Sequence, residues 1–380
     1  MRSGYGISFD STLVGTYEQS IFANPPFVSN VTISNTLLDN PSAGVTVISA
    51  APLTLHGTPI PNKLPYTQQW SFDIQQQIGK FVADVGYYGS KSTHLLGIVD
   101  LNEVPPGAAV AAGITKATAP ITSITTPLLN AIRPFRGYGA INVLENWFNS
   151  NYNSLQASLM ARLPAGNTAR VSYTFSKTLT DATSDRGNAP QNSYNFRADY
   201  ARANFDRTHV LTASYIYTAP FKNVFLKGWE VSGIATFNAG LPLRVTSGLG
   251  LDWGGLGILG TSAVSPRPDR VADPNADAPH TVAKWFNTGA FAAVPTGEVR
   301  PGNAPATSVI GPGYQVWTTS LFRNFKVRER LSVQLRLETF NTFNHTNFQG
   351  ISTSLGATNY GQVTSARDPR RVQLGAKASF

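Results

Sequence analysis

The sequence contains no cysteine, which excludes disulfide bonds, thiolate metal sites and cysteine nucleophiles. Charged residues are also scarce, at 13% of the 380 residues against roughly 25% in an ordinary soluble domain. The chain lacks a run of about 18 apolar residues, so a membrane-spanning helix is excluded. Polarity comes instead from Asn, Gln, Ser and Thr, a composition that suits a surface divided between an apolar phase and water.

The net charge of +9 raises the question of nucleic-acid binding. The Arg and Lys residues are scattered, however, and form no long basic block. Basic residues spread through loops and a water-filled interior account for the charge equally well. We therefore expect no nucleic-acid partner.

Alternation of apolar and polar residues with a period of two is the strongest positive signal, and it marks strands with two different faces. Residues 331–337, with the sequence LSVQLRL, alternate Leu and Val with Ser, Gln and Arg. The segments that carry the pattern are residues 3–14, 66–78, 81–89, 153–163, 168–178, 206–218, 229–238, 315–325, 331–337 and 371–380. They predict an all-β, antiparallel structure with ten membrane-length strands and no substantial helix.

The connections between these segments are alternately long and short along the chain. The short ones are residues 79–80, 164–167, 219–228 and 326–330. The long ones, rich in Gly, Pro, Asn and Ser, are residues 15–65, 90–151, 179–205, 239–314 and 341–370. Outer-membrane barrels have short periplasmic turns and long extracellular loops. The alternation therefore predicts a transmembrane β-barrel, with residues 90–151 and 239–314 outside the cell.

Aromatic residues cluster in or beside the ends of the predicted strands. They are Tyr66, Trp70, Tyr87, Tyr88, Trp147, Tyr152, Tyr215, Tyr217, Trp229 and Trp317. Such positions are typical of the aromatic girdles at the two membrane interfaces. The general preference of aromatic residues for strands is the alternative explanation.

Two short motifs resemble ligand sites but lack the context that those sites need. Gly255, Gly257 and Gly260 have the G-x-G-x-x-G spacing of a dinucleotide loop, but the prolines that follow prevent a helix from starting there. Residues 273, 275 and 277 (Asp, Asn and Asp) have the spacing of a calcium loop. Ala and Lys, however, replace the Gly and Glu that an EF-hand requires at its sixth and twelfth positions. A looser calcium site built from loop oxygens stays open as an alternative.

Histidine positions give no local metal motif. The five histidines are His56, His94, His209, His280 and His345. No H-x-x-x-H pair and no G-x-S-x-G nucleophile elbow occur. The sequence therefore provides no catalytic, cofactor-binding or metal-ligating residue, and we expect that the protein is not an enzyme.

The longer segments, taken in order, carry a family resemblance. They read GYGISFD, FANPPF, LPYTQQWSFDIQQQIGKFVADVGYYGSKSTHL, NYNSLQASLMARL, YTFSKTLTD, FDRTHVLTASYIYTAPF, GWEVSGIATFNAGLPLRV, WFNTGAF, SLFRNFKVRERLSVQLRLETFNTFNHTNF and RRVQLGAKASF. This series, which covers nearly the whole chain, resembles Oar-like TonB-dependent receptors. The resemblance implies a barrel of about 22 strands with a plugged lumen. It also implies uptake of a scarce ligand, energised by the inner-membrane TonB complex.

The sequence departs from that family in having no TonB box, plug domain or signal peptide. We expect residues 1–380 to be the C-terminal portion of a receptor barrel, with about twelve strands missing. TonB would then act only through a missing N-terminal region, and this chain alone would not catalyse uptake. No ligand residue can be carried over, so iron chelates, cobalamin, oligosaccharides and peptides all stay open. Alternatives are an autonomous ten-stranded porin or adhesin, and a secreted β protein that binds glycans through exposed Trp and Tyr.

The last residue, Phe380, follows the alternating apolar residues of the final predicted strand. A terminal aromatic residue in this position resembles the C-terminal signal that the barrel-assembly machinery reads. The alternative is a Phe that only contacts membrane lipid. The expected partners are therefore outer-membrane lipid, the assembly machinery and an unidentified ligand.

Overall fold

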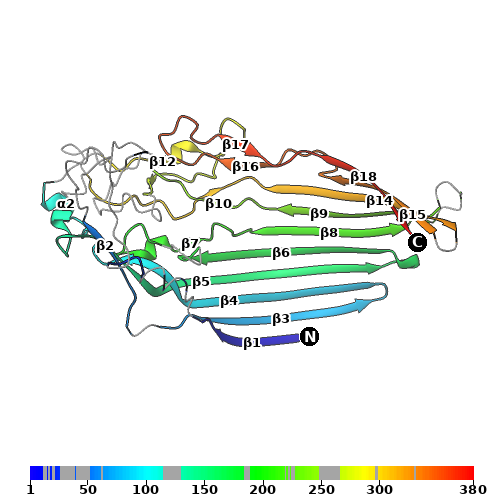
Figure 1. Cartoon of the computed structure of the whole chain (residues 1–380), viewed down its shortest axis with the longest axis horizontal. Helices are drawn as coiled ribbons and strands as arrows, with labels where there is room; N and C mark the ends of the chain where they lie inside the picture. Colours follow the sequence, from blue (N-terminus) through cyan, green and yellow to red (C-terminus); the bar gives the residue numbers. More distant parts are fainter. Residues whose placement is uncertain are drawn as a thin grey trace.

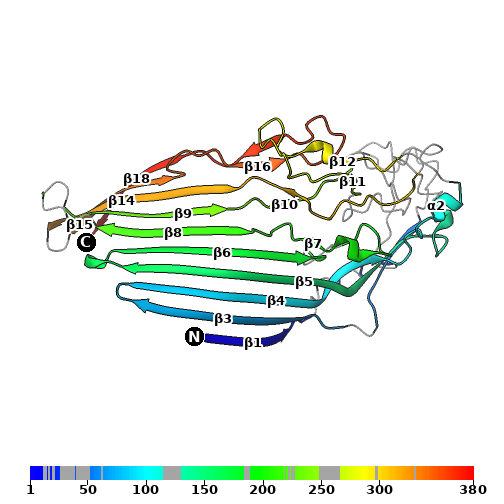
Figure 2. The same ribbon diagram turned by 180° about the vertical axis from the view of Figure 1, so that it is seen from behind.

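The computed structural model describes residues 1–11, 52–60, 63–113, 130–183, 189–218, 227–247, 266–295, 298–328 and 331–380, together with residues 15, 18, 22–25, 39, 220 and 223. Its main feature is one large sheet whose strands run along the long axis of the molecule (Figures 1 and 2). Short turns join the strands at one end. Long segments, several of them with short strands of their own, join them at the other. We call these the turn end and the loop end.

Ten strands form the continuous path of the sheet, as the alternation predicts. In spatial order they are β1 (Arg2–Phe9), β3 (Tyr66–Ile78), β4 (Phe81–Asp100), β5 (Tyr138–Arg162), β6 (Thr168–Thr180), β8 (His209–Thr218), β9 (Trp229–Asn238), β14 (Tyr314–Arg328), β15 (Leu331–Phe340) and β18 (Arg371–Ser379). Every neighbouring pair on this path is antiparallel. The edge strands β1 and β18 lie on opposite sides, and among the described residues their outer edges have no strand partner.

The register places apolar side chains on one face and polar side chains on the other, which we call the apolar face and the polar face. On the apolar face, Phe72 pairs with Tyr87, Tyr87 with Leu155 and Leu155 with Phe175 across four strands. Further along the sheet Leu321, Leu337 and Leu374 form a similar row. Because side chains alternate along a strand, the residues between these rows belong to the polar face.

At the turn end, the connections from β3 to β4 and from β5 to β6 are short. Gly79, with a φ of 59°, allows the left-handed conformation between β3 and β4. A short 3₁₀ turn, η1 (Pro164–Gly166), joins β5 to β6. Among the described residues no helix is long and apolar enough to cross a membrane. The described helical segments are short: α2 (Ala108–Ala111), η1, η2 (Phe196–Asp199) and η3 (Thr288–Ala290).

The prediction that residues 90–151 form one long loop is wrong at both of its ends. Strand β4 continues to Asp100 and β5 begins at Tyr138, so their hairpin extends beyond the other strands. Register shifts near His94, whose φ is 62°, interrupt the alternation. In this region Val99, Leu144 and Phe148 are buried. A strand that is covered on both faces has no reason to alternate, so the period-two signal disappears.

The loop end contains further strands that the alternation does not reveal. They are β2 (Leu53–Gly57), β7 (Ala201–Arg202), β10 (Pro242–Leu243), β11 (Asp269–Arg270), β12 (Phe291–Ala292), β13 (Val309–Ile310), β16 (Phe348–Ile351) and β17 (Val363–Ala366). β2 pairs in parallel with β5, which corrects the expectation of a purely antiparallel sheet. The predicted strand at residues 3–14 is also shorter than expected, since β1 ends at Phe9.

A small hydrophobic core holds the loop end together. Its buried members are Val245, Phe286, Ala290, Phe291, Ala304 and Val309. Phe291 lies in β12 and Val309 in β13, and the other members come from the segments between β10 and β13. The loop end is therefore a packed structure with an interior of its own.

The register also corrects the predicted aromatic girdle. Tyr88 pairs with Ser71 and Ser154, and Tyr152 with Ser90, so both tyrosines lie on the polar face. Trp317 does lie on the apolar face, where its indole N–H donates to the Tyr215 hydroxyl at 3.3 Å. Only part of the predicted aromatic set can therefore contact an apolar phase.

Candidate functional site

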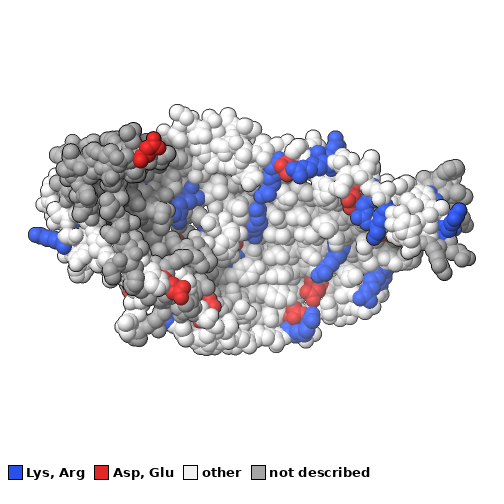
Figure 3. Space-filling view, viewed as in Figure 1, with Lys and Arg blue, Asp and Glu red and all other residues white. Residues whose placement is uncertain are grey.

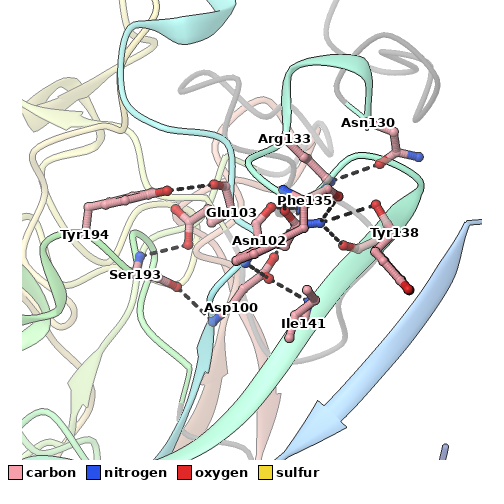
Figure 4. A network of polar contacts seen from close by, with 11 residues as sticks. Asp100, Asn102, Glu103, Asn130, Arg133, Phe135, Tyr138, Ile141, Ser193 and Tyr194 are labelled. Atoms are coloured by element: carbon pink, nitrogen blue, oxygen red, sulfur yellow. Dashed lines mark hydrogen bonds and ion pairs between the residues drawn. The ribbon is translucent and has the colours of Figure 1, made fainter.

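A buried polar network ties three segments together at the loop end (Figure 4). Asn102, which is fully buried, lies two residues beyond Asp100, the last residue of β4. Its side-chain amide donates to the carbonyls of Phe135, at 3.0 Å, and Gly139, at 2.7 Å. Its side-chain oxygen accepts the Phe135 N–H at 2.7 Å. This one side chain therefore fixes the entry into β5 against the exit of β4.

Arg133 reinforces the same junction from inside the connecting segment. Its Nη1 lies 3.2 Å from Asp100 Oδ2 and donates to the Asn102 carbonyl at 2.5 Å, while Nε donates to Asn130 Oδ1 at 2.9 Å. Asp100 also accepts the Ile141 N–H at 2.8 Å. A buried guanidinium of this kind needs its carboxylate and carbonyl partners, because an unpaired buried charge is costly.

The network continues into the segment after β6. The Ser193 N–H donates to Glu103 Oε2 at 2.8 Å, and the Tyr194 hydroxyl donates to the Glu103 carbonyl at 2.9 Å. The Ser193 hydroxyl accepts the Asp100 N–H at 3.1 Å. Burial, with the nearby carboxylates as smaller causes, raises the pKa of Tyr194. Its hydroxyl therefore stays protonated at neutral pH and acts as a donor.

A second group of ion pairs joins the segment after β6 to residues 266–304 of the loop end. Arg267 and Asp199 form a buried ion pair. The backbone N–H of Arg267 donates to the side-chain oxygen of Gln191, and its Nε donates to the Ala304 carbonyl. Arg300 contacts both carboxylate oxygens of Asp269, at 2.8 and 2.7 Å. Those hydrogen bonds to Asp269 raise the pKa of Arg300. These bonds hold the connecting segments in fixed positions.

Burial shifts the pKa of two further groups at the loop end. Arg244 donates to the Ala306 carbonyl at 3.2 Å, and burial, with the neighbouring Arg267 as a smaller cause, lowers its pKa. Burial raises the pKa of Asp181, whose carboxylate accepts the Asn149 N–H at 2.6 Å. Each shift follows from the cost of removing a charge from water.

Three of the five histidines line one open cleft of about 470 Å³ beside the loop end. His209 lies at the start of β8, where its Nδ1 is 2.8 Å from the Tyr173 hydroxyl. His280 packs on Trp285 with 5.0 Å between ring centroids, and His345 completes the set. Among the described residues, however, no group of three or more His, Asp or Glu side chains is arranged to hold a metal ion.

Of the two motifs noted in the sequence, the structure describes only the one with calcium-loop spacing. Gly255, Gly257 and Gly260 lie outside the described residues. Asn275, in the motif with calcium-loop spacing, donates to the Ser308 carbonyl at 2.9 Å and accepts the Ile310 N–H at 2.8 Å. Its side chain therefore joins two loop segments, and both its amide and its oxygen are used in that contact.

Some of the charges on the polar face are held in local ion pairs. Arg2 on β1 contacts Asp73 at 2.9 Å and Asp84 at 3.7 Å, which links three neighbouring strands. On β15, Arg336 contacts Glu338 at 3.4 Å. On the face shown in Figure 3, Lys and Arg side chains form separate groups, several of them beside Asp or Glu. On this face the basic residues therefore form no single continuous patch.

Phe380 follows β18 and is 97% exposed. The alternation of β18 puts it on the same face as Val372 and Leu374, which are also exposed. Its position is compatible both with a signal for assembly and with simple lipid contact.

One of the comparisons with known proteins identifies the family of the chain. A family model described as "Outer membrane beta barrel domain" matches residues 1–373. No curated protein sequence matches the chain.

Solved outer-membrane proteins align with the chain at low identity. The Escherichia coli outer membrane transporter YddB aligns at 10% identity with a TM-score of 0.47, covering 88% of this chain and 35% of that chain. Pseudomonas aeruginosa FpvA in complex with a heterologous pyoverdine aligns at 11% identity with a TM-score of 0.38, covering 84% and 27%. The ferripyoverdine receptor of the same organism, bound to ferripyoverdine, aligns at 12% identity with a TM-score of 0.37, covering 84% and 27%. The chain thus spans about a third or less of each of these structures.

Proposed function

The chain belongs to the outer membrane β-barrel domain family and resides in the cell outer membrane, and on that premise we propose that it forms part of the barrel of a TonB-dependent receptor. In this role the barrel carries a ligand across the outer membrane of a Gram-negative bacterium. The loop end faces the outside of the cell and the turn end faces the periplasm. The protein acts as a transporter and not as an enzyme.

The observation that carries the proposal is the two-faced sheet with a packed loop end. Residues such as Leu155, 48% exposed on the apolar face, suit contact with lipid. The opposite face presents hydroxyls, amides and paired charges, which suit a watery or protein-filled interior. The buried network around Asn102 and Arg133 supplies a stable surface at the mouth, where a ligand arrives first.

The outer edges of β1 and β18, which have no strand partner among the described residues, support a barrel larger than ten strands. A sheet edge in lipid exposes N–H and C=O groups that find no water, and each costs several kcal/mol. In an autonomous ten-stranded porin β1 would pair with β18, whereas these strands lie at opposite edges of the sheet. We propose that further strands of the same receptor complete the barrel, and that a plug and a periplasmic segment of that receptor contact TonB.

The orientation can be tested on intact cells. An epitope tag inserted next to Asp277, an exposed loop-end residue, should be reached by antibody in cells that carry the full receptor. A second tag at Gly79, in the turn between β3 and β4, should be reached only after rupture of the outer membrane. The reverse pattern would overturn the orientation.

The transport mode can be tested on the full-length gene product purified from outer membranes. We expect it to bind the purified periplasmic domain of TonB, and to give no steady open-channel conductance in planar lipid bilayers, because a plug fills the lumen. Steady conductance without TonB binding would instead establish the porin alternative.

A further inference from the structure

The polar face is hollowed over the first four strands of the path. An open depression of about 520 Å³ lies over β1, β3, β4 and β5, nearer the loop end than the turn end. The residues that line it from the polar face are Gly4, Gly6, Gln69, Ser71, Tyr88, Ser90 and Tyr152. None of these side chains carries a charge at neutral pH.

The register builds this depression from two adjacent rows of side chains. In the first row Gly6 pairs with Gln69, Gln69 with Ser90 and Ser90 with Tyr152. In the second row Gly4 pairs with Ser71, and Ser71 with Tyr88. Each row therefore begins with a glycine on β1 and contains one tyrosine on β4 or β5. The glycines leave space at one side, and the tyrosines form the wall at the other.

The ring of Tyr88 lies against the sheet because of a third glycine. A Cβ built on Gly86 would lie 2.7 Å from Tyr88 Cε2 and 2.9 Å from the Tyr88 hydroxyl, closer than real contacts allow. Only glycine leaves room for the ring to cover the strand at this point. One aromatic face therefore contacts backbone, and the other is presented to the space above the polar face.

The charges nearest to the depression are already paired with one another. Asp73 lies one row further toward the turn end, and Arg2 contacts both Asp73 and Asp84. The depression itself offers an aromatic surface, two serine hydroxyls and one amide, which can donate and accept hydrogen bonds. An anionic chelate would require nearby cationic side chains, whereas the lining provides none.

These features match the chemistry of a neutral sugar. One face of a pyranose ring consists of C–H groups, which pack on an aromatic ring, while its hydroxyl rim needs donors and acceptors. We propose that the depression is a binding subsite for a neutral sugar unit of an oligosaccharide, with Tyr88 and Tyr152 as stacking surfaces. This inference rests on the proposed receptor function and names the class of its ligand.

Glycine substitutions provide a matched pair of variants. A Cβ on Gly6 would have no atom within 4 Å, so Gly6→Val fills the depression without a clash and suits a strand. Gly375 on β18 also faces the polar side with nothing within 4 Å, but it lies far from the depression along the sheet. Gly375→Val is therefore the control for added bulk on the same face.

The experiment uses the full-length receptor and isothermal titration calorimetry with maltohexaose, cellohexaose, xylohexaose and the charged oligogalacturonate. We expect at least one neutral oligosaccharide to bind. Tyr88→Ala and Gly6→Val should weaken that binding about tenfold. Tyr88→Phe, which keeps the ring, and Gly375→Val should change it less than about threefold. Heat-modifiable migration in gels verifies that each variant is folded.

Three outcomes would overturn the inference. They are binding of oligogalacturonate alone, no binding of any of these sugars, and equal effects of Gly6→Val and Gly375→Val. If the receptor still binds the periplasmic domain of TonB in those cases, the proposed function stands and only the sugar subsite fails. Loss of TonB binding together with an open channel would refute the receptor function itself.

Discussion

The sheet and the loop end use apolar residues in opposite ways. On the sheet Leu155 and Leu374 are 48% and 80% exposed, while at the loop end Phe286 and Val309 are 1% and 0% exposed. The sheet directs its large side chains outward and relies on backbone hydrogen bonds between strands. The loop end directs its large side chains inward, as a water-soluble domain does. The difference fits a chain that meets two solvents, with lipid against the apolar face of the sheet and water around the loop end.

Ion pairs follow the same division. At the loop end the side chains of Arg267 and Asp199 are 3% and 8% exposed, whereas those of Arg336 and Glu338, on β15 of the sheet, are 44% and 27% exposed. The first pair is shielded from water and linked to further hydrogen bonds. The second is screened and has little effect on stability. Substitutions in the two regions should therefore have different sizes and different readouts.

The largest effect is expected from Arg267→Ala, because it leaves the Asp199 carboxylate buried without its partner. The loss should be about 3–5 kcal/mol of local stability at the loop end. Hydrogen exchange should accelerate in residues 189–204 and 266–310 of the full-length protein, while the amides of β3 to β6 stay protected. Arg336→Ala, the control on the sheet, should leave exchange at the loop end nearly unchanged. Equal exchange in both variants would contradict the contrast between the two regions.

The next effect in size is expected from Leu155→Arg, at the middle of the apolar face. A guanidinium facing lipid should cost about 2–4 kcal/mol. The adjacent variant Gln156→Arg puts the same group on the polar face and should cost far less. Urea unfolding of the full-length protein in phospholipid vesicles measures the two values. If both variants lose the same stability, the assignment of the two faces is wrong.

A smaller effect is expected from Gly89→Ala in β4. A Cβ on Gly89 would lie 2.3 Å from the ring of Trp70, which covers this glycine on the apolar face. The overlap should cost about 1–3 kcal/mol, since either ring or strand must move. Gly375→Ala, where the space is open, is the matched control. A shift in Trp fluorescence with the first variant alone would report movement of the indole.

The smallest effect on stability is expected from deletion of Phe380, which lies beyond the last paired residue of β18. Little folded-state packing is lost, so unfolding midpoints should hardly change. The amount of folded, heat-modifiable receptor in the outer membrane should fall if assembly reads this residue. Replacement by Tyr should restore it. Unchanged levels after deletion would leave Phe380 with lipid contact alone.

The strands on the path were predictable because each meets two different environments. Residues 66–78 and 229–238 were predicted with the bounds that β3 and β9 have. The extension of β4 and the start of β5 were not predictable, since Val99 and Phe148 are buried by other segments and alternation is lost there. The small strands of the loop end are too short to display a period.

The polar network at the loop end was also outside the reach of sequence patterns. Arg133 contacts Asp100 and Asn102 from more than 30 positions away. Ser193 meets Glu103 across 90 positions. No local spacing reports such contacts. The depression beside Tyr88 has the same origin, because its two glycines lie on β1 and its tyrosines on β4 and β5.

By itself, the sequence determined the ten strands of the sheet path, the order of short and long connections, and the division of those strands into an apolar and a polar side. A period of two is local, so neighbouring residues are enough to reveal it. Only the tertiary structure decided which strands extend past the sheet, which loop residues form a core, and which polar-face residues of β1 to β5 share a depression. Those properties depend on register and burial between residues that are distant in the sequence.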